Sequence, residues 1–281
     1  DKEIEEKLKE EPQVPDRPFL SGIISYPFYP RVLPLVVGMA LTWTMLLAFG
    51  RFVWSMVSSA SLIAPFAVAA AAIFLLLVTF PTLVTYQRMF ETTSQGDDDS
   101  DCRPEGGLFA FIDWIGDVIP MLVAFFVACA PGMIVMKALH LRPEYYVGMA
   151  FLTLILFPIV LISMLESASV AGIYSKPVWS SFGKVPGTWF KFFSLSTLCF
   201  AGGLGSLLAI VHFGMLEPTP LHNTAVVAGV FGLVFCLTLY FRLMGRLAFV
   251  MSQKILVEDE PDPDEGGTHE QTEDDAEISL V

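Results

Sequence analysis

Residues 62–85 read LIAPFAVAAAAIFLLLVTFPTLVT, a run of the chain without one charged side chain. An α-helix rises about 1.5 Å per residue, so about 20 apolar residues cross the ~30 Å hydrocarbon core of a bilayer. This stretch therefore predicts a membrane-spanning helix.

Similar apolar stretches recur along the chain. The predicted spans are residues 32–50, 62–85, 118–139, 147–168, 190–212 and 223–245. The first is expected to stop before Arg51, with residues 52–61 forming a turn or a short interfacial piece. A soluble domain of this size has too little polar chain to cover six such helices, and a membrane β-barrel would need alternating apolar and polar residues. We therefore predict an all-α fold, a polytopic transmembrane helical bundle of about six spans.

Charge is scarce and segregated. Only 16% of the 281 residues are charged, against roughly 25% in an average soluble domain. Of the 29 acidic residues, six lie in 1–11, six in 86–107 and eleven in 258–277. No basic patch could neutralise phosphates, so we expect no nucleic acid partner. The pattern divides the chain into a polar N-terminal linker (1–18), a transmembrane helical domain (19–252) and a disordered acidic C-terminal tail (253–281).

Lysine and arginine indicate the orientation. With six spans, both termini and the loops 86–117 and 169–189 share one side of the membrane. That side carries Lys2, Lys7, Lys9, Arg17, Arg31, Arg88, Arg103, Lys176, Lys184, Lys191, Arg242, Arg246 and Lys254. The other side carries only Arg51, Lys137 and Arg142. Because basic residues stay cytoplasmic, we expect a multi-pass protein of the cell (inner) membrane with both termini in the cytoplasm.

The spans also group into three helical hairpins, roughly 19–90, 108–172 and 178–250. The second and fourth spans share a Phe-Pro step, Phe80-Pro81 and Phe157-Pro158. The odd spans are each entered through a Pro-containing amphipathic stretch, SYPFYPRVLP, FIDWIGDVIP or SSFGKVPGTW. One interpretation is a pseudo-repeat with an interfacial lead-in to each hairpin. The other is that proline and aromatic residues are common at membrane boundaries.

One acidic residue lies at the edge of a span. Glu166 ends the fourth span at the same predicted depth as Arg242 and Arg246 on the sixth. We predict a structural ion pair between Glu166 and one of these arginines, which lie four residues apart on one helix face. The alternatives are a solvated interfacial carboxylate and a transport or proton-relay group.

The stretch 175–191, which leads from the loop after the fourth span into the fifth, combines basic and aromatic residues. It contains Lys176, Trp179, Lys184, Trp189 and Lys191. Lysines flanked by aromatic anchors are typical of a segment that touches anionic headgroups, so this stretch is a candidate lipid-surface contact.

Other motifs predict no chemistry. His212, His222 and Glu217 lack the spacing of a zinc site, and the DDDSD run at 97–101 lacks the Gly and Glu of a calcium loop. Small residues at four-residue spacing predict close helix packing in lipid. They are Ala201, Gly205 and Ala209, the pair Ala225 and Gly229, and the pair Ala228 and Gly232. We predict no catalytic residue, no metal ligand and no cofactor.

The Phe-Pro steps and the GKVPGTWFKFF lead-in resemble bacterial six-helix membrane-protein families, of Yip type and of the domain-of-unknown-function class. The resemblance covers roughly residues 19–252 and implies no catalytic residues. Together with the residues above, it favours a non-enzymatic membrane scaffold or lipid-organising protein whose partners are the bilayer and other membrane proteins. The alternatives are a small transporter or channel, and a membrane-embedded lipid-modifying enzyme for which Asp113, Asp117 and Glu166 would be the weak candidates.

Overall fold

The computed structural model describes residues 19, 22–59, 61–96, 111–140, 146–215 and 219–258, and every regular element in these ranges is a helix. The elements are η1 (Tyr26–Phe28), α2 (Leu33–Ser58), α3 (Ala64–Ser94), α4 (Phe111–Ala138), α5 (Tyr146–Glu166), α6 (Lys176–Lys184), α7 (Pro186–Met215) and α8 (Pro220–Glu258). All except η1 and α6 contain a stretch that is long and apolar enough to cross a membrane. The predicted all-α bundle of about six spans is confirmed.

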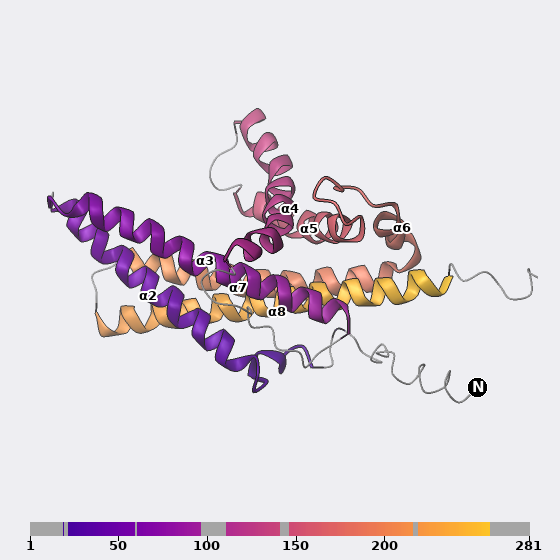
Figure 1. Cartoon of the computed structure of the whole chain (residues 1–281), viewed down its shortest axis with the longest axis horizontal. Coiled ribbons are helices and arrows are strands. Elements are labelled where there is room, and N and C mark those ends of the chain that lie inside the picture. The colour runs from indigo at the N-terminus through magenta and orange to yellow at the C-terminus, as the bar shows by residue number, and fades with distance from the viewer. Residues whose placement is uncertain are drawn as a thin grey trace, which may run out of the picture.

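The arrangement has two parts (Figure 1). Helices α2, α3, α7 and α8 run side by side as an elongated bundle, in which α7 and α8 form the most extensive pair. Helices α4 and α5 pack mainly on each other, and α4 joins the bundle at α3 and then rises steeply away from it. We call the end of the bundle with η1 and the last turns of α8 the terminal end. The opposite end, with the α2–α3 turn, is the hairpin end.

Proline positions explain where several helices start. Pro34, Pro65 and Pro177 occupy the first turns of α2, α3 and α6, while Pro186 and Pro220 begin α7 and α8. The N–H groups in the first turn of a helix have no acceptor within the helix, so proline, which lacks an N–H, loses no hydrogen bond there. Its fixed φ also agrees with helical geometry. These five prolines in the sequence therefore mark where the five helices begin.

Prolines also lie inside the spans. Pro81 is within α3, Pro120 and Pro131 are within α4, and Pro158 is within α5. Membrane helices tolerate such prolines because neighbouring groups satisfy the freed backbone atoms. Beside Pro81, Thr82 accepts a hydrogen bond of 3.3 Å from the indole nitrogen of Trp43, which ties α3 to α2 at this point.

Two boundary predictions are wrong. Helix α2 does not stop before Arg51; it continues to Ser58, so most of the predicted turn at 52–61 is helical. Helix α8 runs to Glu258, beyond the predicted start of the tail at 253. The physical reason is common to both, because a helix continues through polar residues that lower a hydropathy average but leave backbone hydrogen bonding intact. The third span agrees with its prediction, since the apolar stretch of α4 runs from Val118 to Ala138. The stretch FIDWIGDVIP leads into it as the first part of the same helix. The predicted linker (1–18) and the remainder of the tail (259–281) lie outside the described residues.

The segment before α2 also differs from expectation. Ile24 and Phe28 are exposed, as an interfacial lead-in requires, but Phe19, Ile23 and Tyr26 are buried. The η1 turn packs on both α8 and α2. The lead-in is thus partly a component of the protein core at the terminal end.

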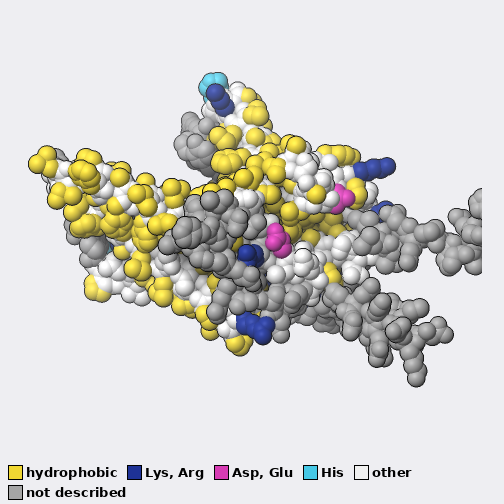
Figure 2. All heavy atoms as spheres, viewed as in Figure 1, with side chains coloured by type: hydrophobic (Ala, Val, Ile, Leu, Met, Phe, Trp, Pro, Cys, Tyr) yellow, Lys and Arg dark blue, Asp and Glu magenta, His cyan; other side chains and the backbone are white. Residues whose placement is uncertain are grey.

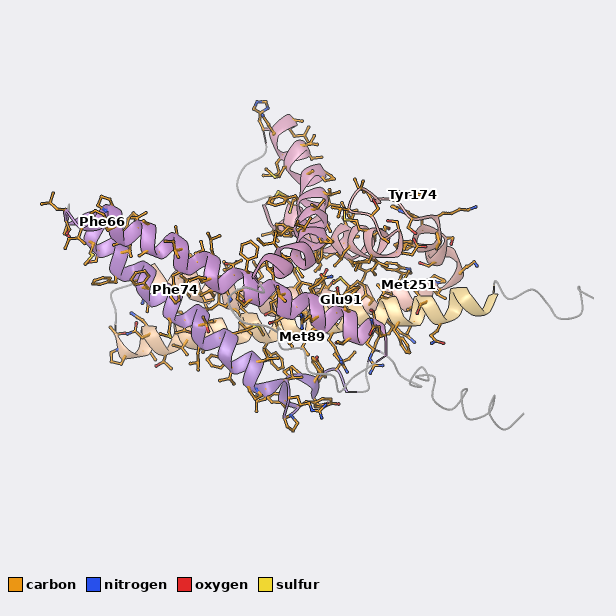
Figure 3. The ribbon with its side chains drawn as sticks, in the orientation of Figure 1. Phe66, Phe74, Met89, Glu91, Tyr174 and Met251 are labelled. Carbon is orange, nitrogen blue, oxygen red and sulfur yellow. The ribbon has the colours of Figure 1, made fainter. Side chains whose placement is uncertain are left out.

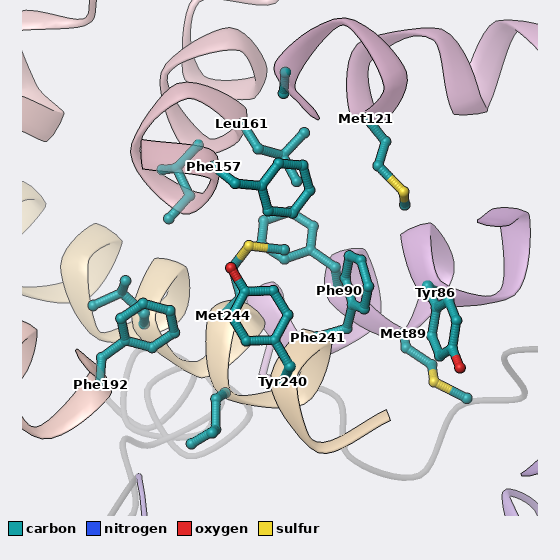
Figure 4. Packing of buried hydrophobic residues seen from close by; sticks show 14 of the residues in the cluster. Tyr86, Met89, Phe90, Met121, Phe157, Leu161, Phe192, Tyr240, Phe241 and Met244 are labelled. Atoms are coloured by element: carbon teal, nitrogen blue, oxygen red, sulfur yellow. The ribbon is translucent and has the colours of Figure 1, made fainter. Parts of the chain in front are cut away.

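Aromatic side chains join the α4–α5 hairpin to the bundle. Phe157 of α5 lies 6.4 Å from Tyr240 and 6.2 Å from Phe241 of α8, measured between ring centroids. Phe241 in turn stacks on Tyr86 of α3 at 4.9 Å. Figure 4 shows this cluster, with Met244 beneath Phe157. Large rings bridge helices whose backbones are well separated, and such pairs add about 0.5–1.5 kcal/mol beyond area burial.

Glycines allow closer contact elsewhere. A Cβ on Gly229 would lie 3.0 Å from the carbonyl oxygen of Ser206, and one on Gly232 would lie 2.5 Å from the Ser206 hydroxyl. The predicted close packing is therefore confirmed at these two positions of the α7–α8 interface. It is wrong for Gly205, where a Cβ would have no neighbour within 4 Å. The sequence analysis did not single out Gly245, where a Cβ would lie 2.7 Å from the carbonyl oxygen of Phe90 in α3.

The outer surface of the long helices is apolar. Hydrophobic side chains gather on the part of the surface formed by the α2–α3 tip and along α4 and α5 in Figure 2. Leu62, Phe66 and Trp54 at this tip are 94%, 75% and 73% exposed, and Phe66 is labelled there in Figure 3. Such a continuous exposed apolar surface is typical of a face that meets lipid.

Candidate functional site

Helix α6 lies at the terminal end, beside the last turns of α8 (Figure 1). Its inner face consists of Val178, Ser181 and Val185, three buried residues on one side of the helix. The Ser181 hydroxyl lies 3.9 Å from the sulfur of Met251 in α8. The apolar side of this amphipathic helix is therefore occupied by protein.

The opposite face of α6 is exposed and basic. Lys176, Ser180, Gly183 and Lys184 are all exposed on it, and Trp179 at its edge is 45% exposed. At 100° per residue, these five positions occupy the half of the helix that faces away from Val178, Ser181 and Val185. We call Lys176, Trp179 and Lys184, together with the exposed Lys191 near the start of α7, the basic face.

A row of aromatic rings supports the basic face. Tyr174 stacks on Trp179 at 5.9 Å, Trp179 contacts Phe182 at 5.9 Å, and Phe182 stacks on Trp189 at 4.1 Å. Trp189 then stacks on Phe193 of α7 at 5.4 Å. The row leads from exposed rings into the core and holds α6 against α7, which fixes the direction of the basic face.

Trp179 and Trp189 have different environments, although the sequence analysis treated them alike. Trp189 is 2% exposed, and its indole nitrogen donates a hydrogen bond of 2.9 Å to the Ser181 hydroxyl. Phe190, its neighbour, is 75% exposed. Trp189 therefore belongs to the core, and the exposed rings near the basic face are Tyr174, Trp179 and Phe190. Contact of this surface with lipid stays a prediction.

The predicted ion-pair residues lie in different environments. Glu166 is exposed, and its carboxylate accepts a short hydrogen bond from the Ser175 hydroxyl across the α5–α6 connection. Arg242 and Arg246 are buried, 0% and 2% exposed. Arg242 donates to Thr93 at 3.2 Å, and its guanidinium carbon lies 3.8 Å from the centre of the Tyr26 ring. These contacts connect α8 to α3 and to η1, while an ion pair with Glu166 stays a prediction.

No group of three His, Cys, Asp or Glu side chains that could hold a metal occurs among the described residues. His222 lies next to Phe213, with ring centroids 5.9 Å apart, and His212 contacts the same ring at 5.1 Å. Glu217 and the run at 97–101 fall outside the described residues, as do the side chains of Asp113 and Asp117.

Arg51 lies at the hairpin end, where it makes contacts that its place in the sequence did not predict. The Arg51 guanidinium donates to the carbonyl oxygens of Gly214, at 2.6 Å, and Phe213, at 3.1 Å. It also donates to the side-chain oxygen of Asn223, at 3.2 Å. Arg51 thus joins α2 to both ends of the α7–α8 connection. The only available signal was an arginine close to the end of an apolar run.

The fold and the site together define a class, that of multi-pass integral membrane proteins with a helical transmembrane bundle. No family model matches the chain, and no curated protein and no solved structure is detectably similar to it. The resemblance to Yip-type families is therefore neither supported nor opposed by these comparisons, and the basic face carries the functional argument.

Proposed function

We propose that the protein is a non-enzymatic membrane scaffold that gathers anionic phospholipid at the cytoplasmic face of the bilayer. One observation carries the proposal: α6 is held against α8 and α7 by its apolar side, with Lys176 and Lys184 directed outward beside Trp179. A helix fixed in this way presents its cations without an ordering step at the moment of binding.

The energetics favour several weak contacts. A basic side chain close to an anionic membrane surface contributes about 1 kcal/mol. Three lysines therefore supply roughly 3 kcal/mol, which corresponds to more than a hundredfold local enrichment of anionic over zwitterionic lipid if the contributions add. Trp179 and Phe190 add interfacial anchors of the kind found at headgroup depth.

The orientation is part of the proposal. The basic face lies at the terminal end, and the lysines and arginines of the chain concentrate on the same predicted side. The positive-inside rule assigns such a side to the cytoplasm, where anionic lipids give a negative surface potential. In this arrangement the basic face meets the leaflet whose charge complements it. The bilayer is then the main partner, and membrane proteins that prefer anionic lipid would be secondary partners.

The test uses the full chain purified in a neutral detergent. Phosphatidylglycerol should raise the thermal unfolding midpoint more than phosphatidylcholine with the same acyl chains. The variant Lys176→Gln/Lys184→Gln/Lys191→Gln should lose this difference, because it removes the charge and keeps the length of the side chains. The control Lys137→Gln removes one exposed cation at the end of α4 and should keep the difference. An equal response to both lipids in the parent chain would refute the proposal.

A further inference from the structure

The last turns of α8 lie beside the basic face. Met251 contacts Ser181 on the inner side of α6, and α8 ends at Glu258, seven residues later. Met251 and Tyr174 lie near the same end of the molecule in Figure 3. The last described residue of α8 therefore lies about 10 Å along the helix axis from the contact with α6.

The chain that follows is strongly acidic. Residues 259–277 contain ten Asp and Glu side chains and no Lys or Arg. They are Asp259, Glu260, Asp262, Asp264, Glu265, Glu270, Glu273, Asp274, Asp275 and Glu277. Nineteen residues can extend over about 60 Å at most. The segment, which we call the acidic tail, is therefore long enough to reach the whole basic face.

We infer that the acidic tail binds the basic face within the same chain and competes there with anionic lipid. The carboxylates of the tail and the phosphates of lipid headgroups are anions that the same three lysines would attract. The inference rests on the proposed function, because competition has meaning only if lipid binds this face.

The magnitudes fit a displaceable contact. An exposed Lys–carboxylate pair contributes about 0–1 kcal/mol, so three lysines hold the tail only weakly. Attachment to α8 compensates for this weakness, since a short connection gives effective concentrations in the millimolar range. The tail would cover the basic face at low anionic lipid content and leave it when the anionic surface becomes dense. The protein would then respond to membrane charge with a threshold.

Cross-linking tests the contact directly and without lipid. A water-soluble carbodiimide applied to the detergent-purified full chain should join Lys176, Lys184 or Lys191 to carboxylates of the tail, as identified by mass spectrometry of the peptides. The yield should fall strongly between about 0.05 and 0.5 M salt, where the Debye length shrinks from about 14 to 4 Å. Absence of these cross-links at low salt would overturn the inference.

A tail variant tests the competition. Changing all ten carboxylates of 259–277 to the matching amides should increase the apparent affinity for phosphatidylglycerol by roughly three- to tenfold, because affinity scales with the fraction of uncovered face. The matched control neutralises the N-terminal acids Glu3, Glu5, Glu6, Glu10 and Glu11 and should leave the affinity unchanged.

The outcomes separate the two ideas. If the tail variant and the parent bind phosphatidylglycerol equally, and both more tightly than phosphatidylcholine, competition is refuted and the lipid site stands. If neither chain distinguishes the two lipids, the lipid site itself fails. If the N-terminal control has the same effect as the tail variant, a general charge effect replaces the specific contact.

Discussion

Arg51 shows how a single side chain can close one end of a helical bundle. The last carbonyl groups of a helix have no partner within the helix and carry a partial negative charge. The Arg51 guanidinium bonds to two of them, on Phe213 and Gly214 of α7. A charged fork is well suited to this position because it satisfies several acceptors in one geometry.

Replacement of Arg51 should destabilise the hairpin end. We expect Arg51→Gln to lower the free energy of unfolding by about 1–3 kcal/mol, because the half-buried carbonyl groups of Phe213 and Gly214 would lose a charged donor. Arg51→Lys should lie between the parent and Arg51→Gln, since it keeps the charge and loses the fork. Thermal unfolding in detergent measures all three. Equal midpoints would show that the contacts with α7 contribute nothing to stability.

Ser181 has a comparable role at the terminal end. Ser181→Ala should cost about 1–3 kcal/mol, because the buried indole N–H of Trp189 loses its acceptor. Trp189→Phe removes the indole N–H and so the requirement for an acceptor. In that background, Ser181→Ala should lower the free energy of unfolding much less. A double-mutant cycle of unfolding free energies measures this coupling. Strict additivity would contradict the role of the hydrogen bond.

At the scale of elements, helix lengths exceed what crossing a bilayer requires. Helix α8 has 39 residues and is about 58 Å long, nearly twice the ~30 Å hydrocarbon thickness. The second half of α8 carries the buried Arg242 and Arg246, and its end contacts α6 through Met251. The excess length therefore builds the platform on which the basic face rests.

Close packing of α8 on α3 gives a sharp comparison between two glycines. Gly245→Ala should destabilise the protein by roughly 1–3 kcal/mol, because the new methyl group would overlap the backbone of Phe90. Gly205→Ala is the matched control, with no atom within 4 Å of the added Cβ. Alanine is the better helix former by about 1 kcal/mol, so this variant should be neutral or stabilised. Chemical denaturation in mixed micelles would measure both, and equal effects would contradict the close contact of α8 with α3.

The sequence predicted the positions of the helices better than it predicted which side of each helix is buried. The apolar runs identified all six spans, because a bilayer demands length and hydrophobicity and both are visible in the chain. Trp179 of α6 and Trp189 of α7 could not be told apart, since their burial depends on how these two helices pack on each other and on α8. Gly205 and Gly245 show the same limit: four-residue spacing marks a possible seam, and only the neighbouring helix decides which glycine is used.

At the scale of the whole molecule, the two ends differ in character. The hairpin end carries exposed apolar side chains at the α2–α3 tip, such as Leu62 and Phe66. The terminal end carries the basic face, the exposed Glu166 and the buried arginines of α8. The arrangement of the α4–α5 hairpin relative to the bundle could not be predicted, because an apolar helix face packs equally well against lipid or another helix.

The proposed topology makes the two ends accessible from opposite sides. Ser59 at the α2–α3 turn and Lys137 at the end of α4 are exposed and should face away from the cytoplasm, whereas Lys176 should face it. Lys137 gives the strictest test of this topology, since it lies at the end of α4, which rises steeply from the long bundle (Figure 1).

Labelling of single cysteines in intact bacterial cells with a membrane-impermeant maleimide therefore distinguishes which side of the membrane each end of the bundle faces. The parent would have Cys102, Cys129, Cys199 and Cys236 replaced by alanine. We expect Ser59→Cys and Lys137→Cys to react from outside, and Lys176→Cys to react only after the cells are opened. Labelling of Lys176→Cys in sealed cells, or protection of Lys137→Cys, would contradict a six-span bundle with its basic face in the cytoplasm.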